Sequence, residues 1–186
     1  GYPGLPYRVS SLPKTNQERL KKIEEIKDFV NLMDENLKKN LTLRYLKNQD
    51  SHYSKFDTTI FENKGIKIDT GQKSFLSSIA NTKIIIHQAN STGFLETLFF
   101  NIPTILILNK KIERQRKTAD YYFKQFTKHK MIFFNAKDAA NFLKDNFLNI
   151  NEWWSQKKLQ KIKRDFCNLY VRKSNQPFKT LAKKIK

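Results

Sequence analysis

The fold is decided by the stretch KIIIHQANSTGFLETLFFNIPTILIL, residues 83–108. Its β-branched run Ile84–Ile86 is typical of a strand buried on both faces, as in a parallel sheet. Apolar residues at helical spacing follow a small polar turn and predict a helix, which Pro103 ends. Thr104–Leu108 supplies the next buried strand. This order predicts a helix start just beyond the carboxyl end of a parallel strand, where open α/β sheets bind ligands.

The polar turn is a candidate phosphate site formed by Asn90, Ser91, Thr92 and Gly93. Hydroxyl groups and free backbone N–H groups at a helix start favour an anion, and glycine lets a ligand approach the backbone. Glu96 follows within the helix, where a carboxylate can accept the two vicinal hydroxyls of a ribose. The alternatives are plain helix capping for Ser91 and Thr92 and a solvated position for Glu96.

Two further residues are secondary candidates for substrate contact. His87 ends the strand before the turn, and its alternative is a core histidine bonded to backbone. Arg44 lies on an otherwise apolar strand and could pair with a phosphate or carboxylate. Its alternative is an ion pair on the sheet face.

Established catalytic and cofactor motifs are missing from the sequence. It has no P-loop, no dinucleotide GxGxxG, no CxxC and no HExxH. One cysteine, Cys167, and three scattered histidines predict neither a metal site nor a Cys–His nucleophile pair. We therefore expect no cofactor, and a reducing, cytoplasmic setting.

The remaining pattern alternates strands and helices. Strands are predicted near 41–46, 66–68, 83–87, 104–108 and 131–134, and helices over 15–39, 75–80, 119–126, 135–147 and 151–170. This predicts an α/β fold with a doubly wound, mostly parallel sheet, a long amino-terminal helix and a carboxy-terminal helix. We divide the chain into a lead-in and helix (1–40), a ligand-binding domain (41–150), and a last helix with a weakly ordered tail (151–186).

The net charge of +19 points to an anionic partner: nucleic acid, an acidic membrane surface or a phosphorylated substrate. Residues 157–186 hold eleven lysines and arginines against one acid, Asp165, although such a run can also be a solvated tail. No apolar run is long enough to span a membrane, and no signal peptide is evident. The chain starts at Gly1 rather than Met, as a fragment or a processed product would.

Residues 83–108 resemble the nucleotide-binding half of glycosyltransferases of the two-domain GT-B architecture. The shared parts are a strand, a small-residue turn (Asn90–Gly93), a helix with an early Glu96, and a proline before the next strand. Over nearly the whole chain, the sequence is similar to a bacterial family of transferases of surface-polysaccharide synthesis, including the Tyr121-Tyr122 and Trp153-Trp154 pairs. CDP-glycerol glycerophosphotransferases carry a comparable turn. Many relatives have an acidic residue in it, where this chain has Ala89-Asn90.

The resemblance implies a Rossmann-like, carboxy-terminal GT-B half that binds a nucleotide-activated sugar or a CMP- or CDP-linked donor. It implies a saccharide or lipid-linked acceptor and a partner amino-terminal domain that these 186 residues do not include. The last helix would cross back to that domain. The basic tail would hold the protein at the inner membrane.

Two other functions stay open at this point. A basic nucleic-acid-binding module would explain the charge, although most aromatic residues occupy core positions and no nucleic-acid motif is present. A nucleotide-sugar epimerase shares the GT-B architecture and would also need the second domain.

Overall fold

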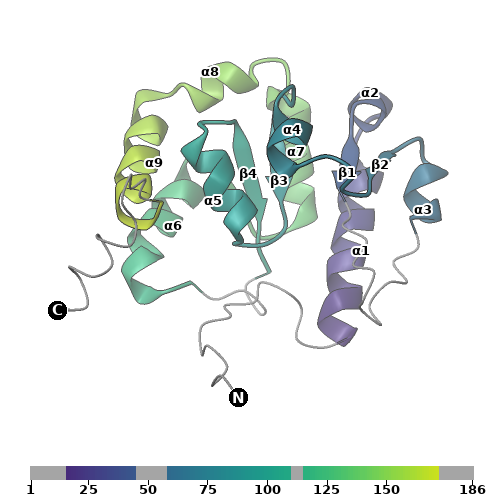
Figure 1. The fold of residues 1–186 in the computed structure, drawn as a ribbon, viewed down its shortest axis with the longest axis horizontal. Coiled ribbons are helices and arrows are strands. Elements are labelled where there is room, and N and C mark those ends of the chain that lie inside the picture. Colours follow the sequence, from purple (N-terminus) through teal and green to yellow (C-terminus); the bar gives the residue numbers. More distant parts are fainter. Residues whose placement is uncertain (1–15, 45–57, 110–114, 172–186) are drawn as a thin grey trace.

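The computed structural model describes residues 16–44, 58–109 and 115–171. These residues form a mixed α/β structure with two small parallel sheets (Figure 1). The smaller sheet pairs β1 (Thr42–Arg44) with β2 (Lys67–Asp69). The larger sheet has the order β3 (Ile85–His87), β4 (Thr104–Ile107), β5 (Ile132–Phe133). Residues 1–15 of the predicted lead-in and helix (1–40), and residues 172–186 of the predicted last helix and tail (151–186), lie outside the described residues.

The helices complete the element order. Along the chain they are α1 (Asn16–Leu32), α2 (Glu35–Lys39), α3 (Thr59–Glu62), α4 (Phe75–Ile79), α5 (Thr92–Phe99), the 3-10 turn η1 (Lys117–Ala119), α6 (Asp120–Lys128), α7 (Ala136–Asn146), α8 (Ile150–Trp154) and α9 (Lys157–Tyr170). None of the described helices has the length and apolarity needed to cross a membrane. All five predicted strands are present, with β2 displaced by one residue and the other four shortened, and α3 was not predicted.

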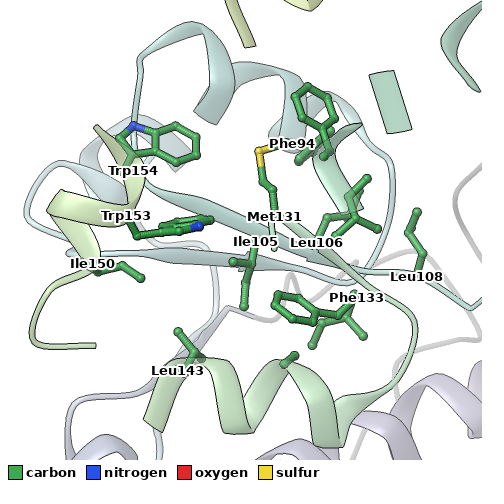
Figure 2. Packing of buried hydrophobic residues seen from close by; sticks show 14 of the residues in the cluster. Phe94, Ile105, Leu106, Leu108, Met131, Phe133, Leu143, Ile150, Trp153 and Trp154 are labelled. Atoms are coloured by element: carbon green, nitrogen blue, oxygen red, sulfur yellow. The ribbon is translucent and has the colours of Figure 1, made fainter. Parts of the chain in front are cut away.

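The larger sheet carries the main core. Every residue of β4 is buried. The three strands follow chain order, and right-handed crossovers place both α5 and α6 on one face of the larger sheet. On that face, α9 packs against α5 and α6. The other face is covered by α7, on which α1 packs. In Figure 2, Phe94 and Met131 lie on the α5 side of the sheet, while Phe133 and Leu143 lie on the α7 side.

Among the described residues, the predicted single sheet is instead two separate parallel sheets. β1 and β2 each expose one residue, Thr42 and Lys67, and cover a second, small core of Val30, Phe61 and Ile66. The strand order of the larger sheet does not reverse. The doubly wound arrangement is therefore not established by these strands.

Two predicted long helices are broken. The amino-terminal helix ends at Leu32, because Asp34 adopts an extended conformation and its carboxylate accepts a hydrogen bond from the Leu37 N–H at 2.8 Å, which starts α2. The final helix breaks between Trp154 and Lys157. There the Gln160 side chain donates to the Trp154 carbonyl at 2.6 Å, capping the end of α8.

The Trp153-Trp154 pair belongs to the core of this domain. Both side chains are buried, and Trp154 Nε1 donates to the Asn101 carbonyl at 3.0 Å, just after α5. Asn101 has a left-handed backbone (φ 58°) and its side chain accepts from the buried Lys163 ammonium. The end of α5 is therefore closed by groups from α8 and α9.

Candidate functional site

The carboxyl ends of β1, β2 and β3 bring Arg44, Asp69 and His87 to one region of the molecule. Two ring contacts connect them through α4. The Arg44 guanidinium lies 5.9 Å from the centre of the Phe75 ring, and that ring lies 6.4 Å from His87. The strand ends and the start of α5 thus form one neighbourhood, as the predicted carboxyl-edge site requires.

Arg44 is occupied by groups of the protein itself. One of its terminal nitrogens donates to the Asp69 carboxylate and, at 2.7 Å, to Ser78 Oγ. The other donates to the Lys73 carbonyl at 2.9 Å. The pKa of Asp69 is lowered, first by a hydrogen bond from the Gly71 N–H and further by Ser78 and Arg44. Arg44 therefore makes the ion pair named above as its alternative, and fixes the loop between β2 and α4.

His87 is largely buried and held by α5. Its Nε2 lies 3.2 Å from Thr97 Oγ1, whose own proton goes to the Phe94 carbonyl at 2.8 Å. Thr97 must therefore accept, so Nε2 carries the proton and Nδ1 is the acceptor. Burial lowers the pKa of His87 to about 4, which keeps the ring neutral at pH 7. The hydrogen-bond partner of His87 is thus the hydroxyl of Thr97. The alternative given above, a core histidine, was expected to bond to a backbone group instead.

The start of α5 has no cap from its own residues. Ser91 occupies the N-cap position but makes no capping hydrogen bond. Within the described part of the chain, the N–H groups of Thr92, Gly93 and Phe94 also have no hydrogen-bond acceptor. These are the donors that remain free in a helix first turn. The plain capping alternative therefore does not describe Ser91.

Gly93 faces the ring of His87. A methyl group built at Gly93 would lie 3.5 Å from His87 Cε1, 3.6 Å from Phe75 Cζ and 3.7 Å from Ser91 Oγ. These are ordinary contact distances, so neither a positive φ nor a clash demands glycine here. What glycine provides is access to the backbone of the first turn.

Asn90 and Glu96 flank this opening. Asn90 is partly exposed in the turn before α5, and Glu96 lies one helical turn into it. Among the residues described, neither side chain has a hydrogen bond or ion pair. Both remain available to a ligand in this structure.

The helix α1 adds residues that the sequence patterns did not point to. Lys22 is buried, and its ammonium donates to the Gln88 carbonyl, 3.3 Å away, in the turn before α5. Glu25 accepts from the Asn109 side chain at 2.7 Å, just after β4. A lysine on an apolar helical stripe is the one signal that could have suggested Lys22.

A metal site and a reactive cysteine are two further kinds of site that the described residues could offer. No group of three or more His, Cys, Asp or Glu side chains is placed to hold a metal ion within residues 16–44, 58–109 and 115–171. Cys167 packs against the main core, and burial raises the pKa of its thiol. It is thus a partly buried side chain at the edge of the core.

Comparison with known proteins gives one family. A family model described as LIC12162 family transferase matches residues 1–185. Searches of curated proteins and of solved structures gave no match.

Proposed function

The chain belongs to the LIC12162 family of transferases, and we propose that its described domain binds the nucleotide-activated donor of a glycosyl or related transfer in bacterial surface-polysaccharide synthesis. The donor would be a nucleotide sugar or a CMP- or CDP-linked compound. One observation carries the proposal: the first turn of α5 presents unpaired N–H groups at the carboxyl edge of a parallel sheet.

The proposal assigns a role to each residue around that turn. The N–H groups of Thr92 to Phe94, with the hydroxyls of Ser91 and Thr92, hold the phosphates. They also stabilise the leaving nucleotide as negative charge develops on it. Lys22, next to Gln88, adds positive charge nearby. Helix dipole and lysine together can carry this charge, so the scheme needs no metal.

Two side chains would recognise the rest of the donor. Glu96 has a carboxylate free to accept the ribose hydroxyls. Neutral His87 offers Nδ1 as an acceptor for a hydroxyl, since its Nε2 is used by Thr97. Arg44 acts indirectly in this scheme, by holding Phe75 and the β2–α4 loop against the site.

The finer architecture is part of the proposal. We take the domain as the Rossmann-like, carboxy-terminal half of a GT-B enzyme, with the smaller sheet continuing the larger one across a reversal of strand order. A separate amino-terminal domain would supply the saccharide or lipid-linked acceptor. The catalytic base would come from there, and a chain without that domain would bind the donor without transferring it.

Attachment to the inner membrane is a related proposal for the basic tail. Lys- and Arg-rich segments bind anionic lipid surfaces, and the tail follows α9 directly. Binding to vesicles that contain anionic phospholipid should be lost when residues 171–186 are deleted. Unchanged binding would reject this role for the tail.

The donor site is tested by thermal-shift titration with UDP, GDP, CDP, CMP and a short oligonucleotide at low and moderate salt. Ligand binding raises the melting temperature by mass action. One nucleotide should raise it in a salt-resistant way, and Ser91→Ala/Thr92→Ala should abolish the shift. Ser77→Ala/Thr82→Ala removes two exposed hydroxyls elsewhere and is the matched control.

A second variant separates loss of binding from loss of folding. Gly93→Ala fits at ordinary contact distances, so the free protein should melt normally, while its methyl group occupies the space a phosphate would enter. Normal nucleotide binding by Gly93→Ala would contradict the site.

Two other outcomes would point to the alternatives. A shift with the oligonucleotide alone, lost as salt rises, would favour a nucleic-acid-binding module, which the charge of +19 supports. Consumption of a nucleotide sugar without any acceptor would indicate an epimerase.

A further inference from the structure

A cavity lies beside Phe133 of β5, which is an edge strand of the larger sheet within the described residues. It is an open groove of about 520 Å³, within the usual range for small-molecule sites. Its lining comes from the end of α6, the length of α7, and α8. The α6 end precedes β5, so this part of the groove lies at the amino ends of the strands, opposite the α5 site.

One side of the groove is a basic lip formed by Lys128 and Lys130. Lys130 has a left-handed backbone, φ 61°, in the turn that ends α6. The Lys130 and Met131 N–H groups donate to the Thr127 and Phe126 carbonyls, a pairing that usually places glycine at this position. Lys130 thus adopts a backbone conformation that glycine would adopt with less strain. Residues with such strained backbone conformations cluster at functional sites.

His129 lies between these lysines and is neutral. Its pKa is lowered, first by burial and then by the charges of Lys128 and Lys158. Two lysines, Lys128 and Lys130, line the groove at this lip and would attract an anionic group placed there. The lining also holds Asp138, whose carboxylate accepts from the Asn135 amide at 2.8 Å, and Asp145 on α7.

The floor of the groove is aromatic. The Phe142 ring lies 5.0 Å from Trp153 and 5.3 Å from Phe133, centre to centre. Trp153 Nε1 donates to the His129 carbonyl at 3.0 Å, which fixes the floor to the lip. Aromatic floors of this kind accept the apolar face of a ring.

The opposite wall is polar and follows α7. Asn141 and Asp145 are exposed along the groove, one helical turn apart, and Gln156 closes the end beyond α8. Amide and carboxylate groups at that spacing can bond to a series of hydroxyl groups.

From these three surfaces we infer that the groove binds a saccharide that carries an acidic group. The lip takes the acidic group, the aromatic floor takes a sugar ring face, and the α7 wall takes hydroxyls. The inference does not rest on the donor site. A transferase with such a groove would retain its polymeric acceptor or product at a distance from the donor.

The test measures tryptophan fluorescence during titration with an oligogalacturonate, a neutral oligosaccharide of equal length, and inorganic phosphate. The chain has two tryptophans, and Trp153 lies in the groove. Lys130→Gly relieves the backbone strain, so its melting temperature should be unchanged or higher, while oligogalacturonate binding weakens roughly ten-fold through loss of a charge-assisted contact. Asp145→Ala should weaken it as well, and Lys124→Ala, an exposed lysine of α6 outside the lining, should not.

The result expected is saturable binding of the acidic oligosaccharide, stronger than that of the neutral one and reduced in Lys130→Gly. Wild-type affinity in Lys130→Gly would overturn the inference. So would equal binding of the neutral oligosaccharide, an equal response to phosphate alone, or no binding by any probe.

Discussion

The starts of α5 and α7 differ although both helices follow a strand of the same sheet at its carboxyl edge. Asn135 closes the start of α7: its side-chain oxygen accepts from the Asp138 N–H at 2.8 Å, and its amide donates back to the Asp138 carboxylate at 2.8 Å. Ser91 has the same position before α5 and makes no such bond. Two helices with the same place in the sheet topology therefore differ: the start of α7 is capped by a side chain, and the start of α5 is not.

Unlike α7, α5 is stabilised from its carboxyl end. The pairings of the Asn101 and Ile102 N–H groups with the Leu98 and Thr97 carbonyls satisfy its last turn, and Trp154 and Lys163 hold Asn101. A helix anchored in this way can leave its first N–H groups unpaired. The comparison therefore predicts large effects at the end of α5 and small ones at its start.

The largest effect is expected for Trp154→Ala. It removes a buried indole from the main core together with its hydrogen bonds to Asn101. Loss of a buried tryptophan typically costs about 3–5 kcal/mol of unfolding free energy. Urea denaturation should show this loss, while Leu148→Ala, at an 86% exposed position, should change stability little. A loss below 1 kcal/mol would mean that α5 is not anchored there.

Acid should destabilise the fold through His87, which packs beside the open start. Its pKa is about 4 in the folded protein and near 6.5 in the unfolded chain. Between these values the unfolded chain binds the proton and the folded one does not, so stability falls as pH drops from 6.5 to 4. The group contributes roughly 3 kcal/mol over this window. Urea unfolding from pH 7 to 4 should show this slope, and His87→Gln should show a shallower one.

The smallest effects compare the two helix starts directly. Asn135→Ala removes a working cap and should cost about 1 kcal/mol. Ser91→Ala removes no capping bond and should cost at most a few tenths of that. Both values come from urea denaturation of the ligand-free protein. Equal costs would show that Ser91 caps α5 in solution and would remove the contrast.

Local pattern predicted the units of this fold, and long-range packing decided the rest. The strands and α4, α5 and α7 follow from burial runs, caps and Pro103, all of which act within a few residues. The helix breaks at Asp34 and after Trp154 do not follow from local pattern, because apolar residues continue at helical spacing through both positions. The separation of the sheets depends on which strands share a core, and no local pattern contains that information.

The candidate site likewise has one part that the local sequence predicted and another that depends on long-range packing. The turn at Ser91–Gly93 was predictable because its residue types are those a helix start needs. The ion pair of Arg44 with Asp69 and the approach of Lys22 to Gln88 join residues far apart in the chain. Their partners could only be identified once the strands and α1 were in place.

The position of α1 has a consequence for how the molecule comes apart. Val30 belongs to the core under β1 and β2, whereas its neighbour Phe29 and Met33 belong to the core of the larger sheet. The segment of α1 therefore supplies side chains to both cores, and the release of either sheet removes part of the packing that holds α1. Amides of both sheets should consequently exchange with solvent in a single cooperative opening.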